Sequence, residues 1–567
     1  MKLSFEQLLQ APNVLALSLE TSGTNYVKDR CLVASFYNDS FFGSIDFNDY
    51  SAEQLLEFFT AFLTPRSIIY HDSKLTMHFL WKYFKGKIYE TTFADTLLMA
   101  KLMDSTIGMD VESLAVKILG LDSTLRYEGI KQALFKKQHQ DDLYAAMAYD
   151  IREAKNEERA RNIFKIYEHL KANLYSTSLY ALEKEFSKRI LVVETNGVKV
   201  DKSYLTTLGV TLCETADIYV RKYPEIAKLG SSEQVANHIQ TTWPDIPLLK
   251  QTSTGKASAD SDVLESLAQK YTGQAIAEFC KDVLTYRHTT HTYSTFVVGL
   301  VTKLDENDRL HGTFNTMGTT QGRLSAEQPN LQQVQDDEEI RGAFIGNLTV
   351  ADYSQMEAIL WVYFIQDPEL LDAVVHDIDI YTFLAARLYH MTLEEVQKEL
   401  WRRKKCKTLF LAKLYGMGRA LFMARSGDIP PDIIESVFKG VKVMSDIMTN
   451  FITTHGYAET YYGRRRYLKL HQAYIGVNTF IQGTAADILK RAVNRMSWEV
   501  LEKLRLLVHD ELVFEDMTND NRFEMLEDMT ADQRLLKVGV GVGQSWWKAK
   551  KAAHTWKWVN GIFIKMP

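Results

Sequence analysis

The sequence predicts an α/β domain followed by a larger α+β assembly, and therefore a multidomain protein. Strand-like and helix-like runs alternate over residues 1 to about 150, which is typical of an α/β domain. Later strand-like segments are separated by a long helix-rich stretch, which indicates a helical insertion inside an α+β unit. The length of 567 residues also exceeds what one hydrophobic core supports.

The N-terminal region combines both kinds of pattern before the chain becomes mainly helical. Its predicted strands are 13–21, 31–37 and 67–72, and its predicted helices are 51–63 and 75–84. From about 151 to 300 helical patterns dominate, interrupted by a polar loop at 249–261. We expect a self-contained α/β domain followed by a helical arm.

The second half of the chain returns to strand-like patterns on either side of a helical block. The block covers about 356–450, and the strands are predicted at 309–318, 347–354, 457–463, 504–515 and 538–543. An α-rich insertion inside one α+β unit explains this order.

Composition is that of an ordinary globular protein, with 46% hydrophobic and 24% charged residues. No apolar run approaches the length of a membrane span and the N-terminus lacks a signal-peptide pattern, so we expect a cytoplasmic protein. The four cysteines are scattered, which predicts reduced thiols and no zinc site. Net charge is −6, yet the basic runs 401–407 and 463–469 could line a local groove for nucleic acid.

Two acidic residues stand at the ends of predicted strands. A β-branched strand delivers Asp352, and a second strand delivers Asp510 within a hairpin whose tip would be residues 509–511. If the strands are neighbours, these carboxylates could share one or two Mg²⁺ ions, which prefer oxygen ligands. For either residue alone, an exposed acid or one satisfied by a turn is the alternative.

A basic helix is predicted at 402–418, where Gly416 and Gly418 end it. Four of its residues recur every four positions and so share one face: two cations, then an apolar and an aromatic group. That order suits a triphosphate and a flat base, while a solvated basic helix with a buried stripe is the alternative. The four residues are Arg403, Lys407, Leu411 and Tyr415.

Together with segments 319–334 and 478–492, these motifs resemble, in order, those of the family A DNA polymerases, the bacterial polymerase I family with its phage and organelle relatives. The resemblance covers most of 270–550. It implies an RNase H-like 3′-5′ exonuclease domain followed by a right-hand polymerase. The implied limits are 1–155 for the exonuclease-like domain, 156–300 for the thumb, 301–365 and 455–567 for the palm and 366–454 for the fingers.

The resemblance implies a template-directed DNA polymerase that adds deoxynucleotides to a primer 3′ end by two-metal phosphoryl transfer. Asp352, Asp510 and the carbonyl of Tyr353 would hold two Mg²⁺ ions, with Mn²⁺ able to substitute. Glu511 would lie near the ions, and His509 would contact the primer end. The partners implied are primer–template DNA and deoxynucleotides, and we expect a monomer in a phage-like replicative role, with other replication partners unknown.

Further residues match the nucleotide and DNA contacts of that family. Lys407 and Arg403 would grip the triphosphate, with Lys407 the general acid for pyrophosphate, and Glu357 would be the steric gate against a ribose 2′-hydroxyl. Leu411 replaces the usual Phe or Tyr, and Tyr381 stands where many members have His. The remaining matches are Gln355 and Tyr415 at the nucleotide, and Arg323, Asn330, Gln332, Asn478 and Gln482 in the DNA minor groove.

The N-terminal domain resembles a proofreading exonuclease that has lost its acids. Ser18, Thr76 and Ala148 occupy positions where that family carries Asp, and only Glu20 remains. A two-metal hydrolase without three of its four carboxylates should not bind its ions. We predict an inactive, structural domain and no proofreading. The alternative is that Asp72 and Asp150 rebuild the site from shifted positions.

Two other function classes remain open. A single-subunit RNA polymerase would share the chemistry, but the carboxylate at Glu357 and the vestigial exonuclease domain argue against it. A non-catalytic DNA-holding replication factor would not need Asp352, Asp510, Arg403 and Lys407, all of which are present.

Overall fold

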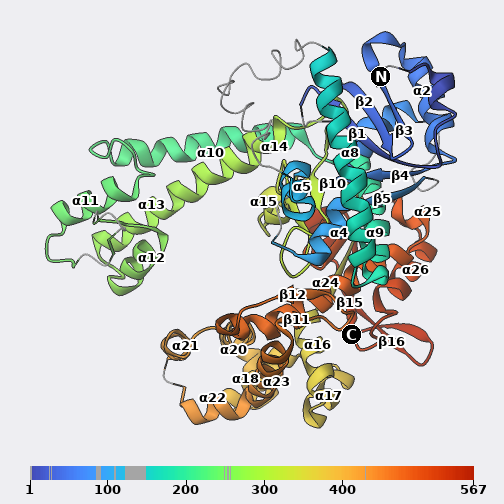
Figure 1. Cartoon of the computed structure of the whole chain (residues 1–567). Helices are drawn as coiled ribbons and strands as arrows, with labels where there is room; N and C mark the ends of the chain where they lie inside the picture. Colours follow the sequence, from blue (N-terminus) through green and yellow to red (C-terminus); the bar gives the residue numbers. More distant parts are fainter. Residues whose placement is uncertain are drawn as a thin grey trace.

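A computed structural model describes residues 3–23, 26, 28–84, 91–106, 110–121, 149–247, 250–251, 255, 257–427 and 429–566. Figure 1 shows an N-terminal domain, a helical arm that projects from one side, and a central sheet beside a block of helices. Within the described residues, no helix is long and apolar enough to cross a membrane.

The N-terminal domain is built on a five-stranded sheet of order β3-β2-β1-β4-β5. Strands β3, β2 and β1 pair antiparallel, and β1, β4 and β5 pair parallel. Leu15 and Leu17 pack with the phenylalanines of α2 on one face, while Ala16 packs with α8 on the other. The elements are β1 (Val14–Thr21), β2 (Cys31–Asn38), β3 (Phe41–Asp46), β4 (Ser67–Tyr70), β5 (Thr92–Asp95), α1 (Phe5–Leu8), α2 (Ala52–Leu63), α3 (Ser73–Leu80), α4 (Thr96–Met103) and α5 (Val111–Leu119).

Two long helices connect this domain to the rest of the chain. Helix α8 (Tyr149–Asn173) lies on β1 and β2, and α9 (Thr177–Asn196) packs against α24 of the central region. The predicted domain limit at 155/156 falls inside α8, so this helix belongs physically to the N-terminal sheet. The arm follows, and its tip has a separate hydrophobic core. Its helices are α10 (Lys202–Lys222), α11 (Ser232–Thr242), α12 (Ser261–Lys270) and α13 (Ala275–Thr292).

The central sheet has six antiparallel strands in the order β13-β14-β10-β15-β16-β17. Strand β10 lies between partners from the far C-terminal part of the chain, which explains why strand signals recur so late. The strands are β10 (Ile345–Ser354), β13 (Leu504–Val508), β14 (Glu511–Glu515), β15 (Lys537–Ser545), β16 (His554–Val559) and β17 (Ile562–Lys565).

The alternating glycines of β15 are explained by α27 (Trp546–Lys551), which packs directly on that strand. A Cβ atom at Gly541 would lie 2.0 Å from the Ala549 carbonyl oxygen, and one at Gly543 would lie 2.5 Å from the Ala549 nitrogen. Larger residues would push the helix away from the sheet. The glycines therefore fix how closely α27 approaches the strands that carry the candidate site.

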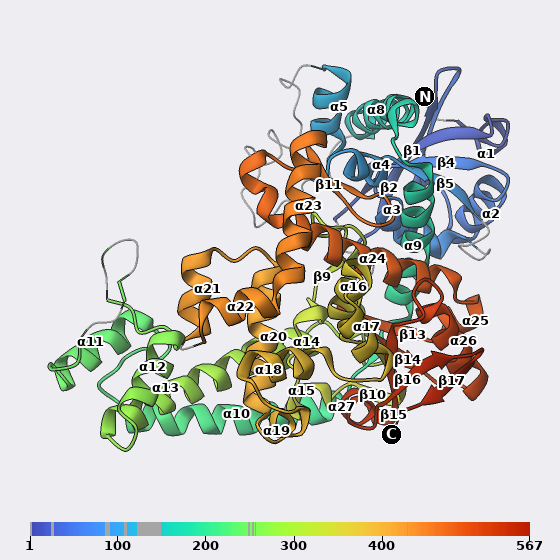
Figure 2. The same ribbon diagram turned by 90° about the horizontal axis from the view of Figure 1, so that it is seen from below.

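The helical block is inserted between β10 and the later strands, as the sequence predicted. It comprises α16 (Met356–Ile365), α17 (Pro368–Val375), α18 (Ile380–Tyr389), α19 (Leu393–Lys398), α20 (Leu400–Leu414), α21 (Arg419–Ser426), α22 (Pro431–Val437) and α23 (Lys439–His455). Figure 2 shows α16 and α24 (Gly476–Arg495) next to one another, between the block and the N-terminal domain. One continuous hydrophobic core joins the block to the central sheet.

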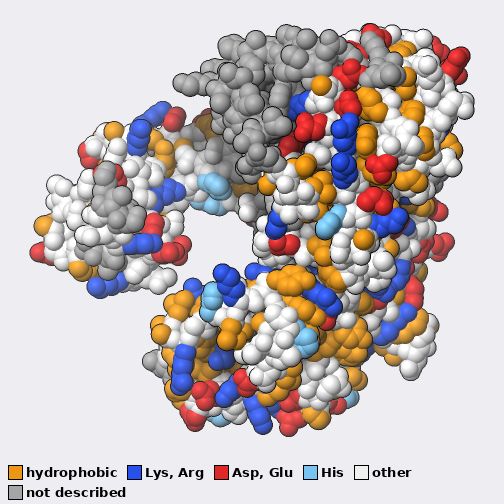
Figure 3. Space-filling view, viewed as in Figure 1, with side chains coloured by type: hydrophobic (Ala, Val, Ile, Leu, Met, Phe, Trp, Pro, Cys, Tyr) orange, Lys and Arg blue, Asp and Glu red, His pale blue; other side chains and the backbone are white. Residues whose placement is uncertain are grey.

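Short elements complete the central region and the approach to it. A hairpin of β11 (Tyr457–Glu459) and β12 (Arg465–Tyr467) follows the block, and α25 (Trp498–Leu501) and α26 (Asn519–Thr530) flank the sheet. The segment before β10 contains β6 (Val198–Lys199), β7 (Arg309–Leu310), β8 (Thr313–Asn315), β9 (Ser325–Glu327), α14 (Gly299–Val301) and α15 (Glu338–Arg341). Figure 3 shows an open cleft between the arm and the helical block, with Lys and Arg side chains on both.

Candidate active site

The two predicted strand-borne acids lie at one end of the central sheet. Asp352 in β10 pairs with Glu511 in β14, and Asp510 belongs to the two-residue turn that joins β13 to β14. The Tyr353 amide donates to the Asp510 carbonyl at 3.3 Å. His509 has a φ of 57°, which the first residue of a tight hairpin turn favours. The backbone therefore places Asp352 and Asp510 on neighbouring elements.

The electrostatics of these acids indicate a crowded negative site. Burial, followed by the charges of Asp510 and Glu511, raises the pKa of Asp352 to about 7. Burial also raises the pKa of Asp510, although the Arg323 guanidinium opposes this. Carboxylates that repel one another in a dry site are stabilised by any cation that enters between them.

Glu511 differs from Asp352 and Asp510 because other side chains of the protein already form a hydrogen bond and ion pairs with its carboxylate. It is 3% exposed, and its Oε1 accepts a hydrogen bond from Trp546 Nε1 at 2.5 Å. Lys550 Nζ lies 2.9 Å from its Oε2, and Arg341 Nη1 lies 3.6 Å from its Oε1. The sequence did not predict these three partners, since they come from α15 and α27. Glu511 thus ties α27 to the strand pair beneath Asp352.

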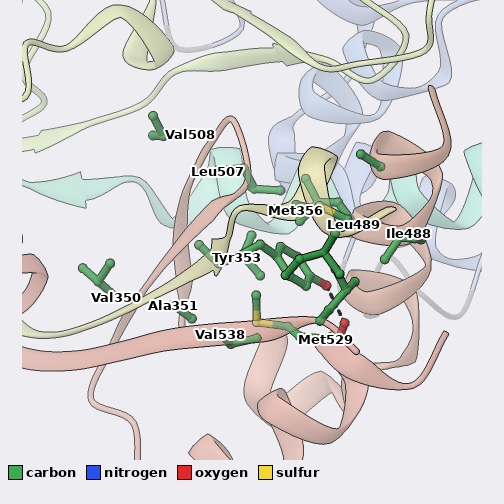
Figure 4. Packing of buried hydrophobic residues seen from close by; sticks show 14 of the residues in the cluster. Val350, Ala351, Tyr353, Met356, Ile488, Leu489, Leu507, Val508, Met529 and Val538 are labelled. Carbon is green, nitrogen blue, oxygen red and sulfur yellow. Dashed lines mark hydrogen bonds between the residues drawn. The ribbon is translucent and has the colours of Figure 1, made fainter. Parts of the chain in front are cut away.

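The Tyr353 side chain points into the core and away from the acids. Figure 4 shows it among Met356, Leu489 and Val538, with its hydroxyl directed at the Met529 carbonyl. That hydrogen bond is 2.6 Å long and buried. Only the backbone of Tyr353 is left to take part in chemistry.

A second group of predicted residues meets beside Asp510. Glu357, at the start of α16, pairs with Arg323 through Oε1 and accepts a hydrogen bond from the Tyr415 hydroxyl through Oε2. The Gln482 side chain also interacts with Tyr415. Glu357 is therefore held by partners from two directions, and it lines a small cavity that Asp510 also lines.

The two predicted triphosphate cations flank one buried aromatic ring. Arg403 Cζ and Lys407 Nζ lie 5.6 Å and 5.5 Å from the centroid of Tyr381, which is 3% exposed. Arg403 also donates to both carboxylate oxygens of Asp379, from Nε at 3.0 Å and from Nη2 at 2.6 Å. Asp379 was not among the predicted site residues. Its position directly before a helical pattern does indicate a helix N-cap, which it forms for α18.

Two other residues predicted to contact the nucleotide, Leu411 and Gln355, mainly contact other parts of the protein. Leu411 is half-buried, and its neighbour Phe410 is fully buried against Trp361 at a ring distance of 5.0 Å. Phe410 therefore cannot replace an aromatic ring on the exposed face of α20. Gln355 accepts a hydrogen bond from the Ile380 amide at 3.0 Å and so joins the end of β10 to the start of α18.

The predicted DNA contacts are dispersed, and the sheet does not bring them all together. Gln332 and His509 line the same small cavity as Asp510, and His509 is exposed. Asn330 is exposed and accepts a hydrogen bond from the Gln332 amide at 3.2 Å, which caps a short turn. On α24, the Asn478 Oδ1 is buried with no hydrogen-bond partner among the described residues.

A buried ionic network lies behind these residues. Arg464 contacts Asp487 and Glu183 at 2.5 Å each, Lys490 contacts Glu183 at 2.6 Å, and all four side chains are at most 4% exposed. A Cβ atom at Gly322 would lie 2.6 Å from Arg464 Nε, so the loop that carries Arg323 rests on the network. The network links α9, the β11–β12 connection and α24.

In the N-terminal domain, the positions predicted to have lost nuclease acids have polar and charged partners. Ser18 donates to Asn156 Oδ1 at 2.5 Å, and Asn156 Nδ2 donates back to the Ser18 carbonyl at 2.9 Å. Glu20 is 5% exposed, and the Lys155 and Arg159 cations lie 3.9 Å and 3.8 Å from its Oε2. The Glu20 carboxylate therefore faces cations that belong to α8.

The remaining positions of that region line a pocket of about 220 Å³ together with Ser18 and Arg159. Thr76 donates to the Asp72 carbonyl at 3.1 Å, and the Asp72 carboxylate accepts the Leu75 amide at the start of α3. Ala148 and the side chain of Asp150 lie outside the described residues.

Comparison with known proteins identifies the family. A model described as DNA polymerase family A matches residues 202–548, more than half of the chain. DNA polymerase I of Bacillus subtilis is 29% identical over 502 residues, which cover 80% of this chain and 55% of that protein. DNA polymerase I of Mycobacterium tuberculosis is 29% identical over 532 residues, covering 85% and 56%. The chain spans about half the length of these curated relatives.

A solved structure confirms the predicted fold class. The POL domain of Pol1 from M. smegmatis, in a complex with DNA primer-template and dNTP, superposes with a TM-score of 0.79 at 24% identity. The match covers 96% of this chain and 97% of that one, and so includes the N-terminal α/β domain as well as the central sheet. This protein therefore belongs to DNA polymerase family A.

Proposed function

We propose that the chain is a template-directed DNA polymerase that extends a primer 3′ end with deoxynucleotides. The observation that carries this proposal is the placement of Asp352 and Asp510 on neighbouring elements at the end of the central sheet. Family membership supports it, as do the Lys and Arg side chains on both sides of the open cleft between the arm and the helical block.

The donors at this site suit two Mg²⁺ ions. Asp352, Asp510 and the Tyr353 carbonyl are hard oxygen donors, and the pKa of Asp352, raised to about 7 by burial and by its acidic neighbours, indicates negative charge in excess of the cations nearby. When bound, such ions would activate the primer hydroxyl and offset the charge of the leaving pyrophosphate. Glu511 is not counted as a ligand, because Trp546 and Lys550 already engage it.

Arg403 and Lys407 would bind the triphosphate. Lys407 is exposed on α20 and can donate a proton to the leaving pyrophosphate. Arg403 is already paired with Asp379 in a bidentate contact, so an incoming triphosphate has to compete with that carboxylate. Tyr381, buried beneath both cations, fixes their positions and has little surface left for direct contact with the nucleotide.

Glu357 would select the sugar. Its carboxylate is anchored by Arg323 and by the Tyr415 hydroxyl, so it cannot swing away to admit a ribose 2′-hydroxyl. Exclusion by a fixed group is a form of specificity that needs no attractive contact with the correct substrate.

Primer extension with Mg²⁺ tests the assignment. We expect deoxynucleotide incorporation by the full chain and its loss in Asp510→Ala, with Asp516→Ala, an exposed acid beyond the end of β14, as the matched control. Undiminished synthesis by Asp510→Ala would refute the site. Binding of primer–template without any synthesis by the unmodified chain would instead favour a DNA-holding factor.

We also propose that the enzyme lacks proofreading. Ser18 and Thr76 carry no charge, and Glu20 already faces Lys155 and Arg159, so divalent ions would meet two cations beside that carboxylate. Asp72 and Asp110 line the neighbouring pocket, but they cap α3 and α5. Incubating a mismatched primer with Mg²⁺ and no nucleotides tests this. Shortening of the primer that Glu20→Ala abolishes would show that the exonuclease is active.

A further inference from the structure

A cavity of about 450 Å³ lies between the N-terminal domain and the region that leads into the central sheet. Its walls come from α3 and α4 on one side, and from residues 302–305 after α14, β8 and β9 on the other. It is separate from the small cavity beside Asp510, and only Asp72 and Leu75 are shared with the pocket near Glu20. Neither polymerisation nor the former nuclease site accounts for it.

The cavity is walled by both polar and apolar groups. Tyr26 and His78 stack at one wall, with ring centroids 3.9 Å apart and an interplanar angle of 8°. Leu75, Leu97 and Leu98 supply apolar surface. Pockets of this size, with apolar walls and a few fixed polar groups, are typical of sites for small organic ligands.

The carboxylates that line the cavity are occupied by donors of the protein. Asp95 accepts the Ser73, Leu97 and Leu98 amides at 2.7 to 3.2 Å, where it caps α4. Asp305 and Glu327 likewise accept hydrogen bonds, Asp305 from the Asn307 and Arg309 amides and Glu327 from the Asn315 side chain. Lys74 is neutralised by the buried Glu194 at 2.8 Å.

Two lysines at the cavity are not neutralised in this way. Lys101 is 7% exposed, and its ammonium donates to the Met317 carbonyl at 3.3 Å; no carboxylate of the described residues lies within ion-pair distance of it. Burial lowers its pKa, and the charges of the more distant Asp72, Asp95, Glu183 and Glu327 only partly oppose this effect. Lys303 is exposed at the rim and likewise has no ion-pair partner among the described residues.

We propose that this cavity binds a nucleoside phosphate, with the phosphate on Lys101 and Lys303 and the base against the Tyr26–His78 wall. An ammonium with unused donors gains most from a charged acceptor, and a phosphate supplies several. The stacked rings offer a flat surface to a base. The phosphate belongs either to a free nucleotide or to the end of a single strand of DNA, since both present the same chemistry.

Calorimetric titration of the full chain with deoxyadenosine monophosphate, in the absence of Mg²⁺, tests the proposal. We expect a binding event, distinct from any at the polymerase site, whose affinity falls about tenfold or more in Lys101→Met. Because Lys101 is buried, Lys303→Ala provides a second variant at the exposed rim, and it should weaken binding as well. Lys407→Ala and Arg159→Ala report any binding at the other two sites, and Lys439→Ala, at an exposed position on α23, is the control that should leave the affinity unchanged.

The possible results of the titration distinguish this proposal from its alternatives. No binding at millimolar nucleotide overturns the proposal, as does binding that Lys407→Ala or Arg159→Ala abolishes while Lys101→Met leaves it intact. If a single-stranded oligonucleotide displaces the nucleotide in a manner that depends on Lys101, the natural ligand is a strand end. If only the free nucleotide binds, the natural ligand is a free nucleotide and not a strand end, and the proposal holds for that ligand.

Discussion

The buried ionic network supports a quantitative prediction about Lys490. Burial is the largest influence on this lysine and lowers its pKa to about 8 from 10.5, although Glu183 opposes the change. The geometry explains why burial prevails: Lys490 Nζ and Arg464 Nη2 share one oxygen, Glu183 Oε1, at 2.6 Å and 2.5 Å. Each cation therefore receives only part of the stabilisation that a dedicated carboxylate would give.

The sign of the effect follows from proton linkage. Between pH 8 and 10.5 the unfolded chain holds a proton on this lysine that the folded chain has released, so stability rises with pH over that range. Below pH 8 the charged lysine costs the fold roughly 3 kcal/mol, at about 1.4 kcal/mol for each pKa unit. Between pH 7.5 and 9.5 the expected gain in the free energy of unfolding is about 2 kcal/mol.

Urea unfolding of the full chain at those two pH values, followed by tryptophan fluorescence, measures this gain. Lys490→Met should remove it, so that the difference in unfolding free energy between the parent and the variant grows by about 2 kcal/mol at the higher pH. Lys439→Met, at an exposed position on α23, is the control and should preserve the gain. Equal pH dependence in the parent and in Lys490→Met would refute the reasoning.

Three further predictions concern the candidate site. Tyr353→Phe deprives the Met529 carbonyl of a buried donor and should lower the free energy of unfolding by about 1–3 kcal/mol, with primer extension retained; loss of synthesis would contradict a purely backbone role. Glu357→Ala should raise ribonucleotide incorporation relative to deoxynucleotide about 10- to 100-fold in single-nucleotide kinetics, and an unchanged ratio would exclude it as the gate. Asp379→Asn keeps a good helix cap while weakening the Arg403 pair, so the nucleotide KM should fall up to about fivefold, and a higher KM would mean that Asp379 orients Arg403 productively.

The sequence was informative wherever local pattern decides structure. The strand that carries Asp352, the hairpin around Asp510 and the helix that carries Arg403 were all predictable, because alternation and helical spacing are visible in short windows. The hairpin turn is one residue shorter than the predicted 509–511: only His509 and Asp510 form it, and Glu511 already belongs to β14.

Long-range partners could not be predicted. Glu511 was expected to assist the ions, but its contacts with Trp546, Lys550 and Arg341 depend on how closely α27 packs on β15. The same holds for Asp379, whose pairing with Arg403 requires α18 and α20 to lie side by side. No window of neighbouring residues contains that information.

The counter-ions of Glu20 are side chains of the N-terminal domain itself. A divalent ion at such a position would come and go with its concentration, and a chelator would remove it. Lys155 and Arg159 are part of the chain and do neither. The Glu20 carboxylate thus keeps counter-ions that do not depend on the supply of free metal.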